Sequence, residues 1–352
     1  MRAFVYNGLP ARVVFGAGAL SKLPEELNRL GAKRALVLST PEQKQAAQSV
    51  QSALGARAAG VYDKAAMHVP IEIAEDARRI ARELGADCCV TVGGGSTTGL
   101  GKAIALTSTL PILAVPTTYA GSEMTPIYGV TEGGAKKTGR DARVLPKAVI
   151  YDPELTLSLP PALSAASGMN AIAHAVEALY SHESNPIIAL MAEEGIRALA
   201  AALPRILQGP KDIDARSDAL YGAWLCGIVL GSSGMALHHK LCHVLGGSFN
   251  LPHAQTHSIV LPHAVRYNYD AAHDAMARIE KALGAQHAAS ALFDLEKRLG
   301  LPLRLAEIGM KETDLEHAAR IATDAPYPNP RKVEYAPVLE LLRNAYAGRR
   351  PS

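Results

Sequence analysis

Several features that define large classes of proteins are missing from this chain of 352 residues. It has no run of Lys and Arg that would follow a phosphate backbone, and its formal net charge is only +3, so nucleic acid is not an expected partner. No apolar stretch is long and uninterrupted enough to span a bilayer. The N-terminal stretch has no sustained apolar core before a small-residue cleavage site, which predicts no signal peptide. We therefore expect a cytoplasmic protein with no membrane partner.

Cysteine is scarce, and two familiar catalytic motifs are absent. The four cysteines form no C-x-x-C pair, and Cys88 and Cys89 lie inside an apolar run, which is typical of buried free thiols in a reducing compartment. There is no H-E-x-x-H motif for a zinc protease and no G-x-G-x-x-G fingerprint for a standard dinucleotide fold. A disulfide scaffold and a cysteine metal site are thus excluded.

The pattern of apolar residues changes near residue 160. Before it, short apolar runs alternate with helical periods, which predicts a parallel sheet covered on both faces. Strands are expected within 34–40, 58–63, 87–96, 110–118 and 146–153, and helices within 41–55, 71–86 and 97–107. After the double proline at 160–161 the strand signal fades, and long Ala- and Leu-rich helical patterns follow. We predict an α/β domain at 1–160 and an all-helical domain at 161–352.

A glycine-rich loop joins a buried strand to the helix that follows it. Gly93, Gly94, Gly95 and Ser96 stand at this junction in "VTVGGGSTTGLGKA". Glycine lets the backbone approach a ligand closely, and a helix N-terminus presents free N–H groups to an anion. A tight turn with no ligand is the alternative explanation for this segment taken alone.

A second polar loop follows the next predicted strand. In "VPTTYAGSEMTP", Thr117, Thr118 and Ser122 supply hydroxyl groups at the same carboxyl edge of the sheet. Ligands of open α/β sheets bind at this edge, so the two loops together predict a dinucleotide site.

Five histidines are concentrated between residues 238 and 257, and four histidines along the chain are candidates for one site. His239 and His243 are four residues apart and share a helix face, and His253 follows in a loop. On an earlier predicted helix, His174 comes four residues after Asn170. A lone histidine is usually a structural residue, but this clustering favours a functional site.

The remaining histidines of this region are assigned differently. We expect His238 on the flank opposite the site. For His257 and His263 a structural or supporting role is favoured.

The motifs "GGGS", "PTTYAGSE", "GMNAIAHAVEALY", "HHKLCHVLGG" and "LPHAQTH", in that order, resemble the iron-containing alcohol dehydrogenase superfamily. The resemblance covers nearly the whole chain. It implies an N-terminal nucleotide-binding domain and an all-α C-terminal domain, in the arrangement shared with dehydroquinate synthase. It also implies NADH or NADPH as cofactor and a homodimer.

One position departs from the metal-dependent members of that superfamily. In those members the ligands correspond to His174, His239, His253 and an Asp at position 170, where this chain has Asn. "GMNAIAHAVEALY" and "GGGSTTGLGKAIAL" most resemble the metal-independent branch, the maleylacetate reductases. An amide oxygen lacks the negative charge of a carboxylate and is a poor ligand for a transition metal. We therefore expect no metal.

The branch implies reduction of the C=C bond of maleylacetate to 3-oxoadipate in the catabolism of aromatic compounds. The hydride adds to an activated double bond, so hydrogen-bond donors rather than a metal can hold the resulting enolate. We predict His174, His239, His243 and His253 as catalytic residues, with His243 and His253 as the acid and electrostatic pair. Asn170, His174, His239 and His253 are predicted to bind the dicarboxylate substrate.

Cofactor choice is expected to depend on Thr40, at the end of the strand within 34–40. Relatives that prefer NADH carry an Asp near this position, where a carboxylate binds the ribose 2′-hydroxyl. Its absence here predicts that both NADH and NADPH are accepted.

Three other functions stay open. A metal-dependent alcohol dehydrogenase would have to tolerate Asn170. A lyase of the dehydroquinate synthase type would use the cofactor only transiently. A binding protein without catalysis would leave two phosphate-binding loops and a histidine cluster unexplained.

Overall fold

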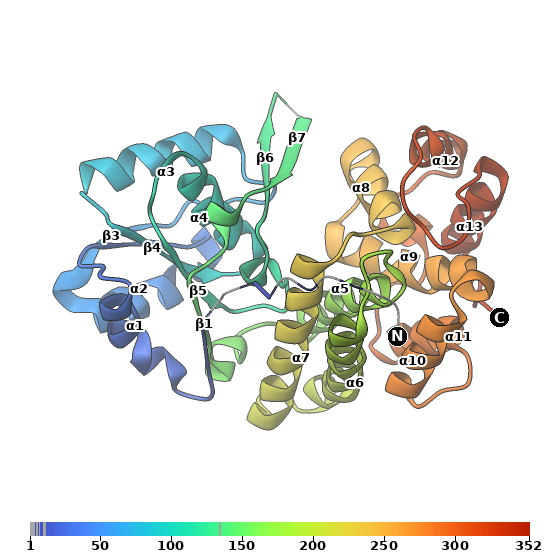
Figure 1. Cartoon of the computed structure of the whole chain (residues 1–352), viewed down its shortest axis with the longest axis horizontal. Helices are drawn as coiled ribbons and strands as arrows, with labels where there is room; N and C mark the ends of the chain where they lie inside the picture. Colours follow the sequence, from blue (N-terminus) through green and yellow to red (C-terminus); the bar gives the residue numbers. More distant parts are fainter. Residues whose placement is uncertain (1–3, 5, 7, 10–11, 134) are drawn as a thin grey trace. The chain divides into compact units, whose positions relative to one another are not determined.

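The computed structural model describes residues 4, 6, 8, 9, 12–133 and 135–352 (Figure 1). The chain divides into two compact units, residues 8–159 and residues 160–352. No single helix among the described residues is long and apolar enough to cross a membrane. The pair α7 (Ile213–Ser232) and α8 (Leu237–Phe249), bent by 95° at its break, passes that test on length and composition alone.

The first unit is built on a six-stranded parallel sheet in the order β1-β8-β5-β4-β2-β3. Its strands are β1 (Arg12–Phe15), β2 (Ala35–Leu38), β3 (Ala58–Tyr62), β4 (Cys88–Gly93), β5 (Ile112–Pro116) and β8 (Ala148–Tyr151). Parallel strands are covered on both faces and therefore read as unbroken apolar runs. This is why the sequence predicted β2, β3, β4, β5 and β8.

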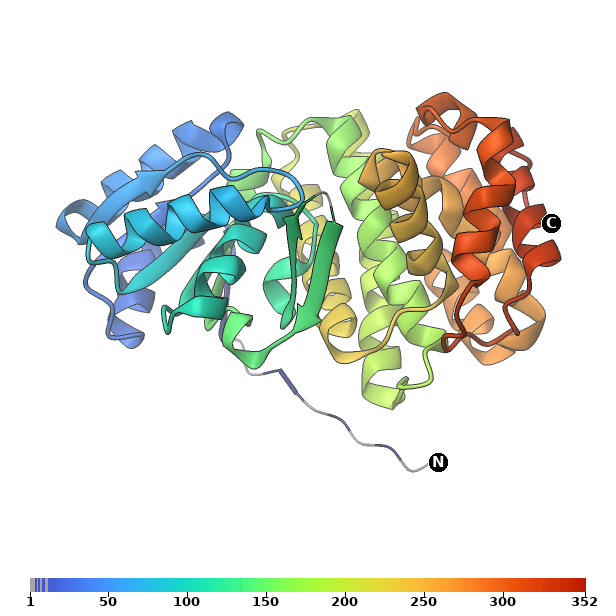
Figure 2. The same ribbon diagram turned by 90° about the horizontal axis from the view of Figure 1, so that it is seen from above.

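Helices cover both faces of this sheet. They are α1 (Leu23–Arg29), α2 (Lys44–Leu54), α3 (Ile71–Glu83) and α4 (Gly95–Thr107). Along β2, Val37 packs in one core with α1 and α2, whereas Leu36 and Leu38 pack in another with α3 and α4. Figure 2 shows α3 lying along its face of the sheet.

Three features of this unit were not predicted from the sequence. They are the helix α1, the edge strand β1, and the antiparallel hairpin of β6 (Ile127–Glu132) and β7 (Ala135–Arg140). β1 is only four residues long, and the hairpin is rich in Lys, Thr and Gly, so neither gives the apolar run that marks a buried strand.

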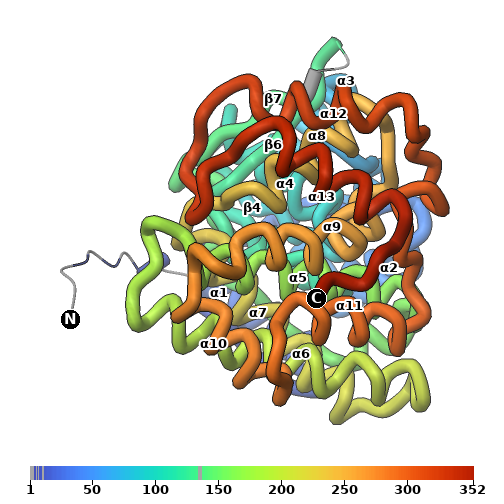
Figure 3. Tube along the Cα trace, turned by 90° about the vertical axis from the view of Figure 1, so that its right-hand side faces the viewer, coloured from blue at the N-terminus to red at the C-terminus, as the bar shows by residue number. Residues whose placement is uncertain are grey.

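The second unit is helical, as the sequence predicted. Its helices are α5 (Pro161–Tyr180), α6 (Pro186–Gln208), α7 (Ile213–Ser232), α8 (Leu237–Phe249), α9 (His253–Asn268), α10 (His273–Leu283), α11 (Ala288–Arg298), α12 (Leu315–Thr323) and α13 (Tyr335–Ala347). α5 is buried along nearly its whole length. α8 and α9 share an apolar core with α12 and α13, which Figure 3 shows beside them. The histidines of α5, α8 and α9 are therefore held on rigid, packed helices.

Candidate active site

The predicted cofactor-binding residues come together at one edge of the parallel sheet. β4 lies between β5 and β2, and Gly93 at the end of β4 pairs in register with Pro116 at the end of β5. The loops after these three strands carry Gly93–Ser96, Thr117–Ser122 and Thr40. The three loops lie far apart in the sequence, but parallel strands bring their carboxyl ends, and the loops that follow them, to the same edge of the sheet.

The glycine loop requires its glycines. Gly93 has a φ of 151°, and a Cβ there would lie 2.5 Å from Thr97 Oγ1. A Cβ on Gly94 would lie 2.9 Å from Thr118 Oγ1 in the second loop. Within residues 12–133, no side chain caps the N-terminus of α4, so its first N–H groups are open to an anion. The loop fits the pyrophosphate of a dinucleotide.

Thr117 joins two of these loops. Its hydroxyl donates to Gln43 Oε1 at 2.9 Å, and its backbone N–H donates to the carbonyl of Gly93 at 3.1 Å. The side chain thus ties the loop after β5 to the turn after β2. Gln43 was not identified from the sequence. Its place in the turn that follows the β2 strand was the sequence feature that could have identified it.

Lys102 is a second residue that the sequence reasoning missed. It is fully buried on α4, and its ammonium donates to the carbonyls of Ser122 and Ile127 and to Thr125 Oγ1, at 2.6, 2.7 and 2.9 Å. Burial lowers its pKa to about 7, against the opposing effect of the nearby Glu123. A lysine inside an otherwise apolar helix was the sequence feature that could have identified this residue. Lys102 anchors the loop that carries Ser122.

A cluster of histidine rings forms inside the helical unit. His174 on α5 stacks against His239 on α8, with ring centroids 5.1 Å apart. The ring of His239 lies 5.0 Å from that of His257 and 6.2 Å from that of His243. His253, at the start of α9, lies 4.2 Å from His257. The four histidines predicted from the sequence thus belong to one connected set of rings.

The members of the cluster differ in exposure. His174 and His239 are buried, whereas His243 and His253 are exposed at its margin. Asn170 lies one turn before His174 on α5 and is also buried.

Buried polar atoms in the cluster lack hydrogen-bond partners among the described residues. They are Asn170 Oδ1, His174 Nδ1, His239 Nε2 and both ring nitrogens of His257. Burying such atoms without partners costs free energy, so a site that holds several of them is suited to a polar ligand.

The prediction that His238 lies on the opposite flank is wrong. Its ring lies 5.0 Å from those of both His239 and His257, and its Nε2–H donates to the carbonyl of His257 at 2.8 Å. His257 lies inside the cluster as well. The loop between α8 and α9 turns the chain back, so that residues of both helices meet, which helix periodicity alone cannot reveal.

Glu177 lies one turn after His174 on α5 and is fully buried. Its Oε2 accepts from His239 Nδ1 at 2.7 Å and from the N–H of Ala236 at 2.9 Å. Its Oε1 accepts from the N–H of His238 at 2.8 Å and from the hydroxyl of Tyr180 at 3.4 Å. The carboxylate therefore caps the N-terminus of α8 and orients a histidine of the cluster.

Burial sets the charge state of these groups. It lowers the pKa of His238 to about 4, and it lowers the pKa of His174, His239 and His257 well below the usual value, with neighbouring histidines adding to the effect. Burial raises the pKa of Glu177, while His238 and the backbone N–H donors lower it. Without substrate, the buried imidazoles of His174, His238, His239 and His257 are thus neutral.

The cluster could bring three imidazoles to one metal ion. Ring nitrogens of His238, His239 and His257 lie within 4.8 Å of one another. However, His238 and His239 each already use one nitrogen as a hydrogen-bond donor, and the oxygens of Glu177 are occupied by other donors. An ion here would receive neutral ligands only, without a compensating carboxylate.

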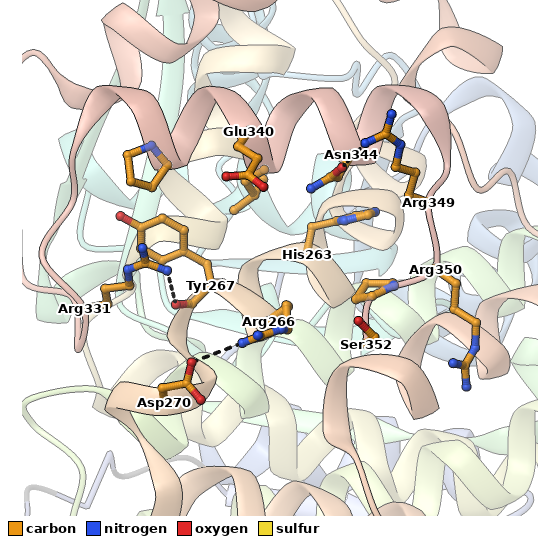
Figure 4. A pocket seen from close by; sticks show the side chains of 13 residues that line it. His263, Arg266, Tyr267, Asp270, Arg331, Glu340, Asn344, Arg349, Arg350 and Ser352 are labelled. Atoms are coloured by element: carbon orange, nitrogen blue, oxygen red, sulfur yellow. Dashed lines mark hydrogen bonds and ion pairs between the residues drawn. The ribbon is translucent and has the colours of Figure 1, made fainter.

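A separate pocket of about 400 Å³ lies between α9, α13 and the last residues of the chain (Figure 4). Its cationic groups are engaged locally: Arg266 pairs with Asp270, and Arg331 stacks on the ring of Tyr267 at 4.4 Å. Arg350 pairs with Asp294. The pocket is lined by His263 rather than by the histidine cluster.

Family models match both units of the chain. "Iron-containing alcohol dehydrogenase" matches residues 10–153, and "Fe-containing alcohol dehydrogenase family, C-terminal" matches residues 164–346. The chain belongs to the iron-containing alcohol dehydrogenase family. It is therefore an NAD(P)-dependent oxidoreductase, and the fold class predicted from the sequence is confirmed.

Individual relatives narrow the branch of the family. The chain is 61% identical over 100% of both chains to a maleylacetate reductase of Burkholderia cepacia. It is 57% identical to one of Pseudomonas sp. (strain P51), over 99% of both chains. The crystal structure of maleylacetate reductase from Agrobacterium tumefaciens is 54% identical, with a TM-score of 0.97 over 100% of both chains. The resemblance to this branch, inferred from the motifs, is confirmed.

Proposed function

We propose that the chain is a maleylacetate reductase that reduces the C=C bond of maleylacetate to 3-oxoadipate with NADH or NADPH. The observation that carries the proposal is the buried histidine cluster. Among the described residues, His174 Nδ1, His239 Nε2 and both ring nitrogens of His257 lack hydrogen-bond partners, and the carboxylate of Glu177 is already engaged by other groups. Full-length identity to proteins named maleylacetate reductase supports it.

The proposed chemistry adds one hydride and one proton across the double bond. A nicotinamide cofactor held at the glycine loop of Gly93–Ser96 would supply the hydride for the carbon β to the ketone. The electron pair of the C=C bond moves toward the ketone oxygen as an enolate, and a proton from a histidine then adds to the α carbon. Because the enolate is delocalised, N–H donors are sufficient to stabilise it.

The substrate carries two carboxylates, and the histidines are suited to them. An anion placed against a neutral imidazole favours its protonated form, so binding brings protons into the cluster. We assign His174, His239, His253 and Asn170 to substrate binding, and His243 with His253 to proton donation and electrostatic stabilisation. The exposure of His243 and His253 supports this division, because these two rings can exchange protons with solvent.

The glycine loop and the loop after β5 are proposed to hold the cofactor. Gly93, Gly94, Gly95 and Ser96 would bind its pyrophosphate at the N-terminus of α4, with Thr118 and Ser122 beside them. Thr117 would act by holding the loop after β5 in place through its hydrogen bond to Gln43. Thr40 lies at the end of β2, where the adenosine ribose is expected.

We further propose that the reaction needs no metal. Asn170 offers an amide in place of a carboxylate, and Glu177 is already occupied by hydrogen-bond donors. The dicarboxylate substrate as partner and the homodimer remain predictions.

The decisive experiment measures NADH and NADPH oxidation with maleylacetate after chelator treatment, with the metal content determined. The wild-type protein should keep full activity without metal and gain nothing from added zinc or iron. In the Asn170→Asp variant, a carboxylate joins the histidines, and zinc affinity should rise by roughly tenfold or more. Wild-type activity that is lost to the chelator and restored by metal would contradict the proposal and select a metal-dependent alcohol dehydrogenase.

A further inference from the structure

The hydrogen bonds around Glu177 determine where the proton of His239 lies. Oε2 faces the N–H of Ala236 and the ring of His239, and Oε1 faces the N–H of His238 and the hydroxyl of Tyr180. A carboxylate has about four lone-pair sites. The backbone N–H groups of Ala236 and His239 face Oε2, that of His238 faces Oε1, and all three can only donate, so Glu177 acts as an acceptor.

A second contact also indicates that Nδ1 of His239 carries the proton of that ring. The Nε2–H of His238 donates to the carbonyl of His257, which can only accept, so the neutral ring of His238 carries its proton on Nε2. Its Nδ1 is then an acceptor, and it faces Nδ1 of His239 at 3.3 Å. With Glu177 Oε2 and His238 Nδ1 both accepting, Nδ1 of His239 must be the donor.

We propose that Glu177 is a positioning residue that holds His239 as the Nδ1–H tautomer, with Nε2 as its exchangeable atom in the substrate site. Nε2 of His239 is buried and has no partner among the described residues, so it is the ring atom left for substrate. When a proton reaches Nε2, the ring becomes an imidazolium beside the Glu177 carboxylate. The same residue caps α8, so ring orientation and helix position are set by one side chain.

The direct test does not depend on catalysis. In protein labelled with ¹⁵N-histidine, long-range ¹H–¹⁵N correlation spectra distinguish Nδ1–H from Nε2–H, and a His239→Gln variant identifies the signal. The Nδ1–H pattern is expected for His239 in the wild-type protein without substrate. An Nε2–H pattern would overturn the proposal, whatever the variants do.

The kinetic test uses Glu177→Gln and rests on the proposed function. A carboxamide has one oxygen, so whichever way it turns, an N–H of Ala236 or His238 faces its NH₂ group. The variant therefore holds the ring of His239 less firmly than the carboxylate does. kcat for maleylacetate should fall on the order of 10- to 100-fold, while KM changes less than about threefold.

Asn329→Ala is the matched control. Asn329 Oδ1 accepts from the N–H of Leu237 at 3.4 Å, so the variant also weakens the first turn of α8 but does not touch the ring of His239. It should lower Tm and leave both kcat and the ¹⁵N pattern unchanged.

If Glu177→Gln lowers Tm in the same way but keeps wild-type kcat, Glu177 is only structural. A wild-type protein without activity on maleylacetate would instead contradict the proposed function, and the ¹⁵N spectrum would still decide the proposal. If Glu177→Gln does not fold, the wild-type spectrum decides as well.

Discussion

At the scale of single residues, Thr40 is where cofactor choice is expected to be set. It is partly exposed directly after β2, and it caps the short helix of Pro41–Gln43. The structure adds Glu42, which the sequence reasoning passed over. The pKa of Glu42 is lowered, first by its backbone hydrogen bond and then by a hydrogen bond with Thr40. A carboxylate is thus already close to the position that an Asp occupies in relatives with a preference for NADH.

We expect Thr40→Asp to favour NADH. A second carboxylate at this strand end would bind the ribose 2′-hydroxyl of NADH and repel the 2′-phosphate of NADPH. The ratio of kcat/KM for NADH to that for NADPH should rise roughly tenfold or more, which corresponds to about 1.4 kcal/mol. Thr40→Asn is the neutral control of similar size. An unchanged ratio in the Asp variant would show that Thr40 is remote from the ribose.

Two properties of Asn170 follow from the sequence alone. They are its spacing from His174 and the absence of the negative charge that an Asp would have at this position. The sequence does not show that Glu177, one turn further along the same helix, is occupied by α8. That depends on where another helix begins.

At the scale of elements, α4 and the loop after β5 act as one unit. Lys102 crosses from the helix to the loop, and its three hydrogen bonds fix residues 122–127. Glu123 in the same loop is fully buried and accepts from the hydroxyl of Tyr151 on β8 at 2.8 Å. The loop proposed to contact the cofactor is therefore held from two sides by buried polar groups.

We expect Lys102→Met to loosen this loop selectively. The change removes three hydrogen bonds in a buried site and leaves the carbonyl of Ile127 without its lysine donor, so the free energy of unfolding should fall by about 3 kcal/mol. KM for NADH should rise severalfold, and KM for maleylacetate should change less. Urea unfolding and initial-rate kinetics measure both effects.

Arg78→Met is the control for that experiment. Arg78 on α3 donates twice to the carbonyl of Ala103, at 2.7 and 3.2 Å, and so braces α4 without touching the loop. It should lower stability and leave KM for NADH unchanged. A rise in KM for NADH equal to that of Lys102→Met would show that the lysine has no specific effect on the loop.

At the scale of the whole molecule, buried neutral histidines make stability depend on pH. Burial lowers the pKa of His238 and of His263 to about 4, from the ordinary histidine value of 6.5. The unfolded chain therefore binds more protons than the folded chain between these two values. The stabilisation is fully present above pH 6.5 and is lost as the pH falls toward 4.

We expect His263→Leu to reduce this acid sensitivity. Between pH 8 and pH 5, each such histidine should lower the free energy of unfolding by about 2 kcal/mol. The variant lacks one of them, so its loss over that interval should be smaller by about that amount. Urea unfolding of both proteins at the two pH values measures the difference. Equal losses would contradict the assignment of His263 as a buried neutral group.

Five strands, the helices between them and the helical character of the second unit followed from the sequence. These features depend on local periodicity, because a strand buried on both faces and an amphipathic helix each leave their own pattern of apolar residues. The short edge strand β1 and the polar hairpin β6–β7 leave no such pattern. β1 pairs with β8, far away in the chain, and the two strands of the hairpin pair with each other without a buried apolar face.

The candidate sites also have features that follow from the sequence and features that depend on tertiary packing. The sequence by itself determined which residue types are present: glycines at a strand end, histidines at helical spacing, and an asparagine in place of an acid. Only the tertiary structure decided that His238 and His257 join the cluster, that Gln43 and Lys102 tie the cofactor loops together, and that Glu177 orients His239. Each of these contacts joins different elements, and their geometry is fixed by how the strands and helices pack.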